Sequence, residues 1–450
     1  MAPTKDHDEP PLHILFFCFL LPGHLIPMAD IAALFIARGV RCTVLTTPVQ
    51  ASTIRSVVDR ANNNSAVDTP ISISVVPFPD VGLPLASQSR RTSERFHHIL
   101  HIQTAELLRE PFRRFLSNHH ADIDAVVSDI IFHWSANAAA EHGLPRIAFL
   151  GTSMFARACT ETVLRGNPFE SCSDDPAAVV SLPGLPPRVE HKRSQTMDPV
   201  KRPRQWAKFH LANDADRSSY GEIFNSFREL EPGYAEHYRA TQLRRRVWLV
   251  GPVGLASGSL EDVGSRGAVA GALSADAAGC LRWLDAKPAS SVVYVSFGSM
   301  TSFSAEQMRE LARGLDLSGK NFVWVIANDG AGRKYILEHM HPGPLYLYVD
   351  QFYNEKLVVE VLGVGVGVGA EEYAPSVETH RVIAGEAIAE SIRKVMGEEG
   401  DGAAMRKKAK ELGVMARGAV EKGGSSYDDV GQLMEELIAR QSVGWRIRLD

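Results

Sequence analysis

A histidine stands where a buried strand is expected to end. The nearly continuous apolar run Leu12–Leu20 predicts a buried parallel strand, and Pro22-Gly23-His24 predicts a tight turn after it. Parallel α/β sheets bind ligands at the carboxyl ends of their strands, where a neutral imidazole can take a proton from a hydroxyl group. His24 is also one of 16 histidines in the chain. Spacing alone therefore favours a surface turn histidine over a catalytic base.

Asp129 and the pair Gly298-Ser299 occupy comparable positions at the ends of predicted strands. Asp129 lies at the end of the strand predicted over Ala125–Ile130, where an acidic residue is usually solvated or caps a helix. Gly298 and Ser299 end the strand predicted over Ser291–Ser299. Glycine permits close approach to a phosphate, and serine can donate its hydroxyl. An ordinary turn explains the same two residues equally well.

A polar and aromatic hexad, Asp350–Glu355, precedes the mostly apolar run Leu357–Leu362. The hexad is expected where a loop meets a helix N-terminus, which suits hydrogen bonds to a polar or anionic ligand. Asp350 and Gln351 are the candidate contacts. A solvated loop is the alternative, and the residues alone favour it.

These candidates belong to a chain in which strands and helices alternate, a pattern that predicts doubly wound parallel sheets. In the first half the predicted strands are Leu12–Leu20, Arg41–Thr47, Ile71–Phe78, Ala125–Ile130, Pro145–Leu150 and Val247–Val253. The predicted helices there are Leu25–Gly39, Gln50–Asn62, Glu94–Leu116 with a break or kink at Pro111, and His133–His142. Two further segments are predicted as a surface loop, Ser171–Gln205, and a strand–turn–helix unit, Tyr220–Pro232.

The second half repeats the alternation after a poorly patterned linker, Gly254–Ala275. Ser304 is predicted to cap a helix over Ala305–Leu317, with Gln307 completing a capping box. The remaining predicted elements are the strands Ser291–Ser299 and Asn321–Ala327 and the helices Glu386–Met396, Ala403–Glu421 and Asp428–Gln441. We therefore expect two Rossmann-like domains, residues 1–253 and 276–450, joined by the linker 254–275.

Composition limits the possible classes of protein. The chain has 450 residues, of which 45% are hydrophobic and 22% charged, with a net charge of -5, so a nucleic-acid binder is not indicated. Its early apolar run is far shorter than a membrane span. The five scattered cysteines favour reduced thiols and a cytoplasmic location. Trp283 and Trp324 are expected in the core, and Arg244–Arg246 on a solvated face.

Several of these segments together resemble the plant family-1 UDP-glycosyltransferases. Ile336–His339, Asp350-Gln351 and Asn354 look like parts of that family's donor-sugar signature. Pro22–Pro27 is similar to the family's first loop, whose histidine is the catalytic base. The resemblance covers Leu12–Ala327 and Ile336–Gly431 in the expected order.

The resemblance implies a role for each candidate residue. His24 would be the base, and Asp129 would orient it and stabilise the imidazolium. Asp350 and Gln351 would bind sugar hydroxyls, with glutamine loosely associated with glucose. The Gly298-Ser299 loop would contact the diphosphate.

The middle of the donor-sugar signature is shorter in this chain than in the family. Only Met340–Val349 separate His339 from Asp350, whereas the family has a His-Cys-Gly-Trp-Asn-Ser core and a following glutamate there. A shortened passage, Ala327–Tyr335, also replaces the segment with the family's uracil-stacking tryptophan. A βαβ unit needs roughly 30 residues, so the signature is truncated and the second domain should be shortened.

The fold implied is α/β, with two Rossmann-like doubly wound domains facing across a cleft in the GT-B arrangement. The function implied is inverting transfer of a hexose, with glucose expected, from a UDP-sugar to a hydroxyl of a small hydrophobic acceptor. The UDP-sugar is a co-substrate, and neither a cofactor nor a metal is expected. A monomer is expected. The alternative is a catalytically impaired relative, or a truncated product, that only binds small hydrophobic molecules.

Overall fold

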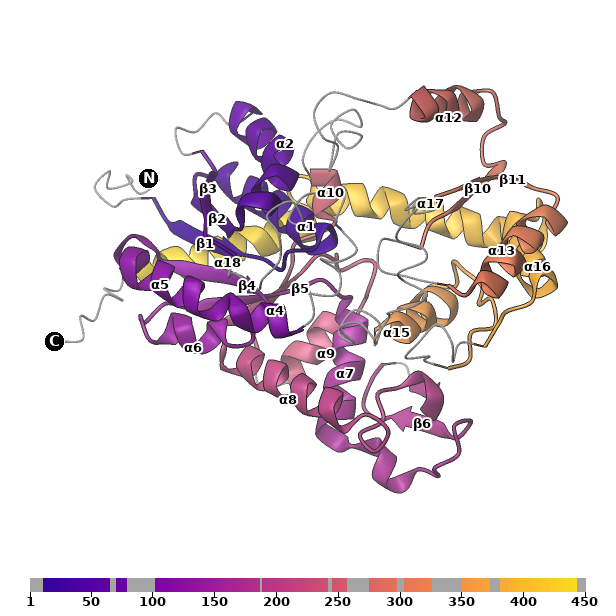
Figure 1. The fold of residues 1–450 in the computed structure, drawn as a ribbon, viewed down its shortest axis with the longest axis horizontal. Helices are drawn as coiled ribbons and strands as arrows, with labels where there is room; N and C mark the ends of the chain where they lie inside the picture. The colour runs from indigo at the N-terminus through magenta and orange to yellow at the C-terminus, as the bar shows by residue number, and fades with distance from the viewer. Residues whose placement is uncertain are drawn as a thin grey trace.

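The structure is a computed structural model and describes residues 11–64, 70–78, 102–186, 188–241, 245–256, 275–297, 303–325, 350–372 and 381–442 (Figure 1). It is α/β, as predicted, and its largest element is a seven-stranded parallel sheet of order β3-β2-β1-β4-β5-β8-β9. The strands are β1 (His13–Phe17), β2 (Arg41–Thr46), β3 (Ser72–Val75), β4 (Ala125–Asp129), β5 (Arg146–Leu150), β8 (Gly221–Phe224) and β9 (Val247–Leu249). All seven lie within the predicted first domain.

Helices cover both faces of this sheet, which explains why its strands are apolar at successive positions. Ile14 and Phe16 of β1 point into one core cluster, and Leu15 and Phe17 point into another. Figure 1 shows the layers, with α1 and α2 on one side and α5 and α6 on the other. The helices of this half are α1 (Pro22–Ile36), α2 (Pro48–Asn64), α4 (Ile102–Leu107), α5 (Arg109–His119), α6 (Ser135–Ala140), α7 (Met154–Gly166), α8 (Pro203–Ser218), α9 (Tyr234–Thr241) and α10 (Val253–Ala256).

Two predicted boundaries near the start of the chain are wrong. Pro22-Gly23-His24 is no tight turn but the first turn of α1, with Pro22 at a position where helices accept proline. The long helix predicted over Glu94–Leu116 is divided at Leu108 into α4 and α5, and residues 79–101 lie outside the described part. Pro111 then falls in the first turn of α5, where a missing N–H breaks no helical bond.

The segment predicted as a long surface loop contains regular structure. An antiparallel hairpin forms from β6 (Val179–Leu182) and β7 (Val189–Lys192), and Val180 and Leu182 of β6 are buried. Alternation over so few residues is a weak signal in a Pro- and Ser-rich stretch. The strand–turn–helix unit after Tyr220 is also partly wrong, because the helix α9 begins only at Tyr234.

The second half contains a small parallel sheet of β10 (Val292–Val295) and β11 (Asn321–Trp324). The helices of this half are α12 (Ala275–Asp285), α13 (Ala305–Leu317), α15 (Gln351–Lys356), α16 (Gly385–Met396), α17 (Gly400–Val420) and α18 (Ser425–Ser442). Within the described residues this sheet has two strands, and Tyr294 on β10 is 69% exposed. The prediction that Trp283 lies in the core is wrong, since it is partly exposed beneath Lys287, and Trp324 is only half-buried.

Ser304 caps α13 as predicted, but the capping box does not form. The Ser304 hydroxyl accepts from the Gln307 backbone N–H at 3.0 Å. The Gln307 side chain instead bonds both backbone groups of Ile383, donating to its carbonyl at 3.1 Å and accepting from its N–H at 2.7 Å. This amide therefore connects α13 to the chain that enters α16, a use that local sequence does not reveal.

The last helices return to the first half of the chain. Figure 1 shows α17 and α18 running from the region of α16 back to the large sheet. Val430, Leu433, Met434 and Leu437 of α18 belong to the same core cluster as β1 and α1. Within the part of the chain that the structure describes, no helix is both long and apolar enough to cross a bilayer.

Candidate active site

His24 lies at the carboxyl edge of the large sheet, in the first turn of α1. Its backbone N–H donates to the Leu21 carbonyl at 3.0 Å, which places the side chain directly after β1. The imidazole is mostly buried, with 14% of the side chain exposed. Phe19 packs edge-on against it, with ring centroids 5.5 Å apart. A ring held in this way keeps a small accessible face and a fixed orientation.

Asp129 ends β4 and faces His24. Because β1 and β4 are adjacent parallel strands, with Phe17 opposite Ser128, the residues that follow them meet at one edge. The Nδ1 atom of His24 lies 2.7 Å from Oδ2 of Asp129. The other carboxylate oxygen, Oδ1, accepts from the Ile131 backbone N–H at 3.0 Å. The structure therefore brings together two residues that are 105 positions apart in the chain.

The surroundings of His24 favour its protonated form. Burial by itself lowers the pKa of the imidazole, but the charge of Asp129, its hydrogen bond and the charge of Asp350 outweigh that effect. The net result is a pKa raised above the ordinary value of 6.5. A base with a raised pKa binds a proton more strongly, and the positive charge of the imidazolium that forms is stabilised by the carboxylate of Asp129.

Asp350 and Gln351 lie at the start of α15, as the sequence predicts for the polar hexad. Asp350 is the residue before the helix, and its carboxylate caps no backbone N–H. It accepts instead from the Thr152 hydroxyl at 2.7 Å, from the Asn354 amide at 3.2 Å and from the Gln351 amide at 3.1 Å. Gln351 is exposed. The charge of Asp350 acts on His24, so the two candidate groups share one site.

The segment that carries Asp350 is anchored on the first half of the chain. Tyr353 is buried within the core cluster of α7 and α9, and its ring packs edge-on against His191 at 4.8 Å. The Ser153 hydroxyl donates to Oδ1 of Asn354 at 2.7 Å. The helix α15 therefore fixes the carboxylate of Asp350 against the turn between β5 and α7.

Gly298 and Ser299, the predicted diphosphate contacts, lie outside the described residues. Their role therefore stays a prediction. Among the residues that are described, no group of three or more His, Cys, Asp or Glu side chains could hold a metal ion.

Comparisons with known proteins connect this geometry to a family, although no family model matches the chain. The chain is 33% identical to the scopoletin glucosyltransferase of Nicotiana tabacum, over 96% of this chain and 99% of that protein. It is 35% identical to the UDP-glucose flavonoid 3-O-glucosyltransferase 7 of Fragaria ananassa, over 96% and 97% respectively. This chain belongs to the plant UDP-glycosyltransferases. The enzyme class and the family resemblance are thereby confirmed.

Solved structures of plant UDP-glycosyltransferases confirm the predicted GT-B fold. Glycyrrhiza uralensis UGT73P12, complexed with glycyrrhetinic acid 3-O-monoglucuronide, superposes with a TM-score of 0.82 and 31% identity, covering 96% of this chain and 97% of that one. Medicago truncatula UGT71G1, complexed with UDP-glucose, gives a TM-score of 0.73 at 22% identity over 95% and 98%, a likeness of fold. The alignment with the Nicotiana relative spans 488 positions, more than the 450 residues of this UDP-glycosyltransferase. Segments of that relative therefore have no counterpart here.

Thr152 and Ser153 contact the candidate site of this UDP-glycosyltransferase through Asp350 and Asn354, and sequence reasoning missed them. They follow β5 as His24 follows β1, and Ser153 caps α7 by accepting from the Ala156 N–H at 3.0 Å. The sequence Gly151-Thr152-Ser153 after a buried strand was the available signal. The rule that selected His24 also selects this turn.

The alternation of glycine and valine over Gly363–Gly369 forms no strand in this UDP-glycosyltransferase. The preceding run Leu357–Val361 is a π-helical turn, and Leu357 and Leu362 pack in the core of the first half. A strand requires a hydrogen-bonding partner, and among the residues that the structure describes the sheet of β10 and β11 does not extend to this stretch.

Proposed function

We propose that this enzyme transfers glucose from UDP-glucose to a hydroxyl group of a small hydrophobic acceptor, with inversion at the anomeric carbon. The observation that carries the proposal is the 2.7 Å contact between His24 Nδ1 and Asp129 Oδ2 at the carboxyl edge of the sheet. The charge of Asp350, the candidate sugar contact, acts on the same imidazole. The family's enzymatic activity favours this function over a non-catalytic binder of hydrophobic molecules.

The proposed chemistry begins at the acceptor. Because Nδ1 of His24 faces Asp129, Nε2 is the atom left to accept the proton of the acceptor hydroxyl. The oxygen of that hydroxyl forms a bond to the anomeric carbon as the bond from that carbon to the diphosphate oxygen breaks. UDP leaves with the bonding electrons, and the imidazolium that remains is stabilised by Asp129.

The donor side of the proposal uses four residues. Asp350 and Gln351 would bind sugar hydroxyls, and this binding would displace the present hydrogen bond from Thr152 to Asp350. Gly298 and Ser299 would contact the diphosphate. The nucleophile and the leaving group lie on opposite faces of the sugar, so attack inverts the anomeric centre.

The acceptor class is proposed from the names of the relatives. Those names specify scopoletin, an anthocyanin and a flavonoid, which are aromatic plant metabolites that carry hydroxyls. The edge of Phe19 against His24 offers apolar surface beside the proposed base.

We also propose a monomer, since one chain holds both the His24–Asp129 pair and Asp350. A cytoplasmic location fits five cysteines that are all free.

The test is a transfer assay with purified protein, UDP-glucose and a panel of flavonols, anthocyanidins and coumarins. We expect a monoglucoside by mass spectrometry and a β-linkage by NMR. The donor is supplied at about 10 mM, roughly tenfold above 1 mM, so that a weak donor site is occupied. Acceptor binding in calorimetry without any product at that concentration would support the non-catalytic alternative instead.

A further inference from the structure

Arg146, the first residue of β5, donates hydrogen bonds to the end of β4, which carries Asp129. Its Nη2 donates to the Asp129 carbonyl at 3.2 Å, and its Nε donates to the Ser128 hydroxyl at 2.8 Å. Both contacts are buried, and 2% of Arg146 is exposed. One guanidinium therefore fixes two successive residues at the point where β4 ends.

The Asp129 carboxylate has few other restraints. In the described structure its hydrogen-bond partners are the ring of His24, the backbone N–H of Ile131 and a distant Cys18 thiol at 3.8 Å. Its main chain is the last residue of β4, and the Ile131 N–H that it accepts from belongs to the turn that follows. The direction of the carboxylate therefore depends on the position of the end of β4 and of that turn.

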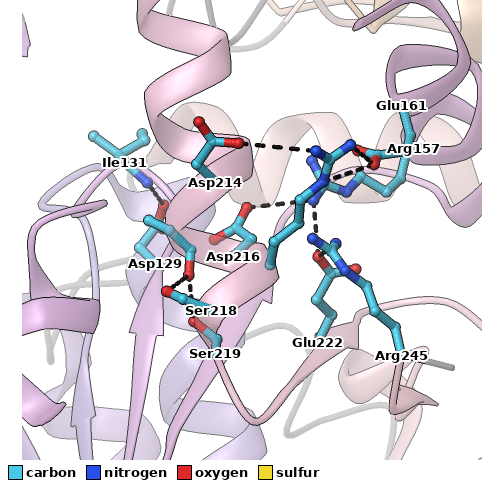
Figure 2. Close-up of polar contacts among 12 residues, drawn as sticks. Asp129, Ile131, Arg157, Glu161, Asp214, Asp216, Ser218, Ser219, Glu222 and Arg245 are labelled. Atoms are coloured by element: carbon cyan, nitrogen blue, oxygen red, sulfur yellow. Dashed lines mark hydrogen bonds and ion pairs between the residues drawn. The ribbon is translucent and has the colours of Figure 1, made fainter. Parts of the chain in front are cut away.

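Arg146 is itself held rigidly by charge. Its Nη1 donates to Oδ1 of Asp216 and to the Ser219 hydroxyl, both at 2.9 Å. Asp216 is fully buried and also faces Arg157 at 3.5 Å, which pairs with Glu222 at 2.8 Å. Figure 2 shows Asp216, Arg157, Glu222 and Arg245 of this network, together with Asp129.

Arg245 was expected on a solvated face, and that prediction is wrong. Its side chain is 9% exposed, pairs with Glu222 and donates to the Tyr238 hydroxyl at 2.7 Å. Arg246 fits the expectation better, because it is about half exposed and pairs with Glu436 at 2.9 Å. Arg244 lies outside the described residues. The buried network therefore includes Arg245, although its position in a run of three arginines predicts exposure to solvent.

Burying so many charges is costly, and a hydrophobic cluster of similar volume is often as stable or more stable. Stability alone therefore gives little reason for a guanidinium at Arg146. The planar guanidinium, unlike a hydrophobic side chain, can donate hydrogen bonds in fixed directions to the Ser128 hydroxyl and to the Asp129 carbonyl.

We propose that Arg146 is a positioning residue for the reaction, which holds Asp129 at hydrogen-bonding distance from His24 by clamping the end of β4. The role of His24 as base rests on the proposed function. The geometric claim, that Arg146 sets the Asp129–His24 contact, does not.

The direction in which the His24 pKa changes distinguishes a positioning role of Arg146 from a purely electrostatic effect of its charge. Asp129 and Asp350 both raise the pKa of His24, while burial lowers it. Removing the positive charge of Arg146 would by itself raise the pKa of a nearby histidine. Displacement of Asp129 would lower it. A fall in the His24 pKa after loss of Arg146 therefore reports movement of Asp129.

The experiment compares wild type with Arg146→Met and Arg157→Met. His24 is titrated by NMR with labelled histidine and assigned with His24→Gln, and kcat and KM are measured across pH. We expect Arg146→Met to lower the His24 pKa, to reduce kcat by about 10–100-fold, and to leave KM for the acceptor nearly unchanged. Arg157→Met is the matched control, because it breaks the same buried network without a contact to Ser128 or Asp129.

Two results would overturn the proposal: an unchanged His24 pKa in Arg146→Met, or an equal fall in Arg157→Met. Arg146→Lys keeps a charge for Asp216 but cannot reach all partners at once, so we expect intermediate values. If Arg146→Met does not fold, Arg146→Lys and the pair Arg146→Met with Asp216→Asn carry the test. If wild type shows no transfer but the titration behaves as expected, the proposed function fails while the role of Arg146 stands.

Discussion

The His24–Asp129 contact is the feature on which the chemistry of single residues depends. We expect His24→Ala to reduce transfer by at least about 100-fold, because the acceptor hydroxyl then keeps its proton. The fold should remain intact, as judged by circular dichroism and thermal unfolding. His119→Ala, an exposed histidine of α5, is the matched control and should retain full activity. Near wild-type turnover in His24→Ala would contradict the assignment.

The raised pKa of His24 predicts how the rate depends on pH. The base must be neutral, so kcat should fall as the pH decreases through a midpoint above 6.5. Asp129→Asn removes the charge that raises this pKa, and we expect its midpoint to move to lower pH along with a large loss of kcat. The stability of the fold should depend on pH in the opposite direction to kcat. The His24–Asp129 pairing stabilises the folded state fully below pH 6.5, and this stabilisation is lost as the pH rises through the folded-state pKa of His24. A pH–rate profile of both proteins checks the shift, and a midpoint that does not move would argue against the pairing.

Gln351 should distinguish the sugar from the nucleotide. It is exposed at the start of α15, and its amide donates to the carboxylate of the neighbouring Asp350 at 3.1 Å. We expect Gln351→Ala to raise KM for UDP-glucose while leaving the Kd of UDP nearly unchanged, since the lost hydrogen bond is to the sugar. Kinetics and calorimetry measure the two quantities. An equal loss of affinity for UDP alone would show that Gln351 contacts the nucleotide.

At the scale of elements, the contact between α13 and α16 depends on a glycine. A Cβ built on Gly314 would lie 2.7 Å from Cβ of Ile388 and 2.9 Å from the Gly385 carbonyl oxygen. Overpacking should destabilise Gly314→Ala by about 1–3 kcal/mol, and the better helix propensity of alanine should offset roughly 1 kcal/mol of that loss. We therefore expect a net destabilisation of up to about 2 kcal/mol. Chemical denaturation of the purified variant measures the change.

Gly413→Ala is the control for that substitution. Gly413 lies inside α17, and nothing stands within 4 Å of a Cβ built there. The same change should therefore stabilise the protein by about 0.5–1 kcal/mol. If Gly314→Ala were also stabilising, the close packing of α13 on α16 would be contradicted.

At the scale of the whole molecule, the donor half should bind its nucleotide weakly. In the described residues the second sheet has two strands, and the sequence has only Met340–Val349 between His339 and Asp350. The family's aromatic platform for uracil and its phosphate-facing helix N-terminus have no counterpart among those residues. We therefore expect a Kd for UDP-glucose above about 1 mM, less than ~4 kcal/mol of binding.

Calorimetric titration with UDP and UDP-glucose measures this affinity. Insertion of the family's missing signature core should restore binding, because it returns the stacking and hydrogen-bonding groups. The unmodified protein serves as the control. Micromolar affinity in that protein would disprove the prediction and would indicate a donor site built from other residues.

Most of the α/β elements could be predicted from the sequence because their signals are local. The apolar run before His24, the cap at Ser304 and the glycine-interrupted helices at the end all appear within a few residues of where they act. The failures have two causes. The hairpin of β6 and β7 was missed because each of its strands has only four residues, too few for a clear alternation. Arg245 was assigned to solvent because its partners, Glu222 and Tyr238, lie on other elements of the fold.

The sequence by itself determined the fold class, the family and the candidate residues at the strand ends, since apolar periodicity and short motifs are local properties of the chain. Only the tertiary structure decided which candidates meet. It placed His24 2.7 Å from Asp129, anchored Asp350 on Thr152, and buried Arg146 behind Asp129. The order of the strands in the sheet causes these contacts: β1, β4 and β5 are neighbours in space although long segments separate them in sequence.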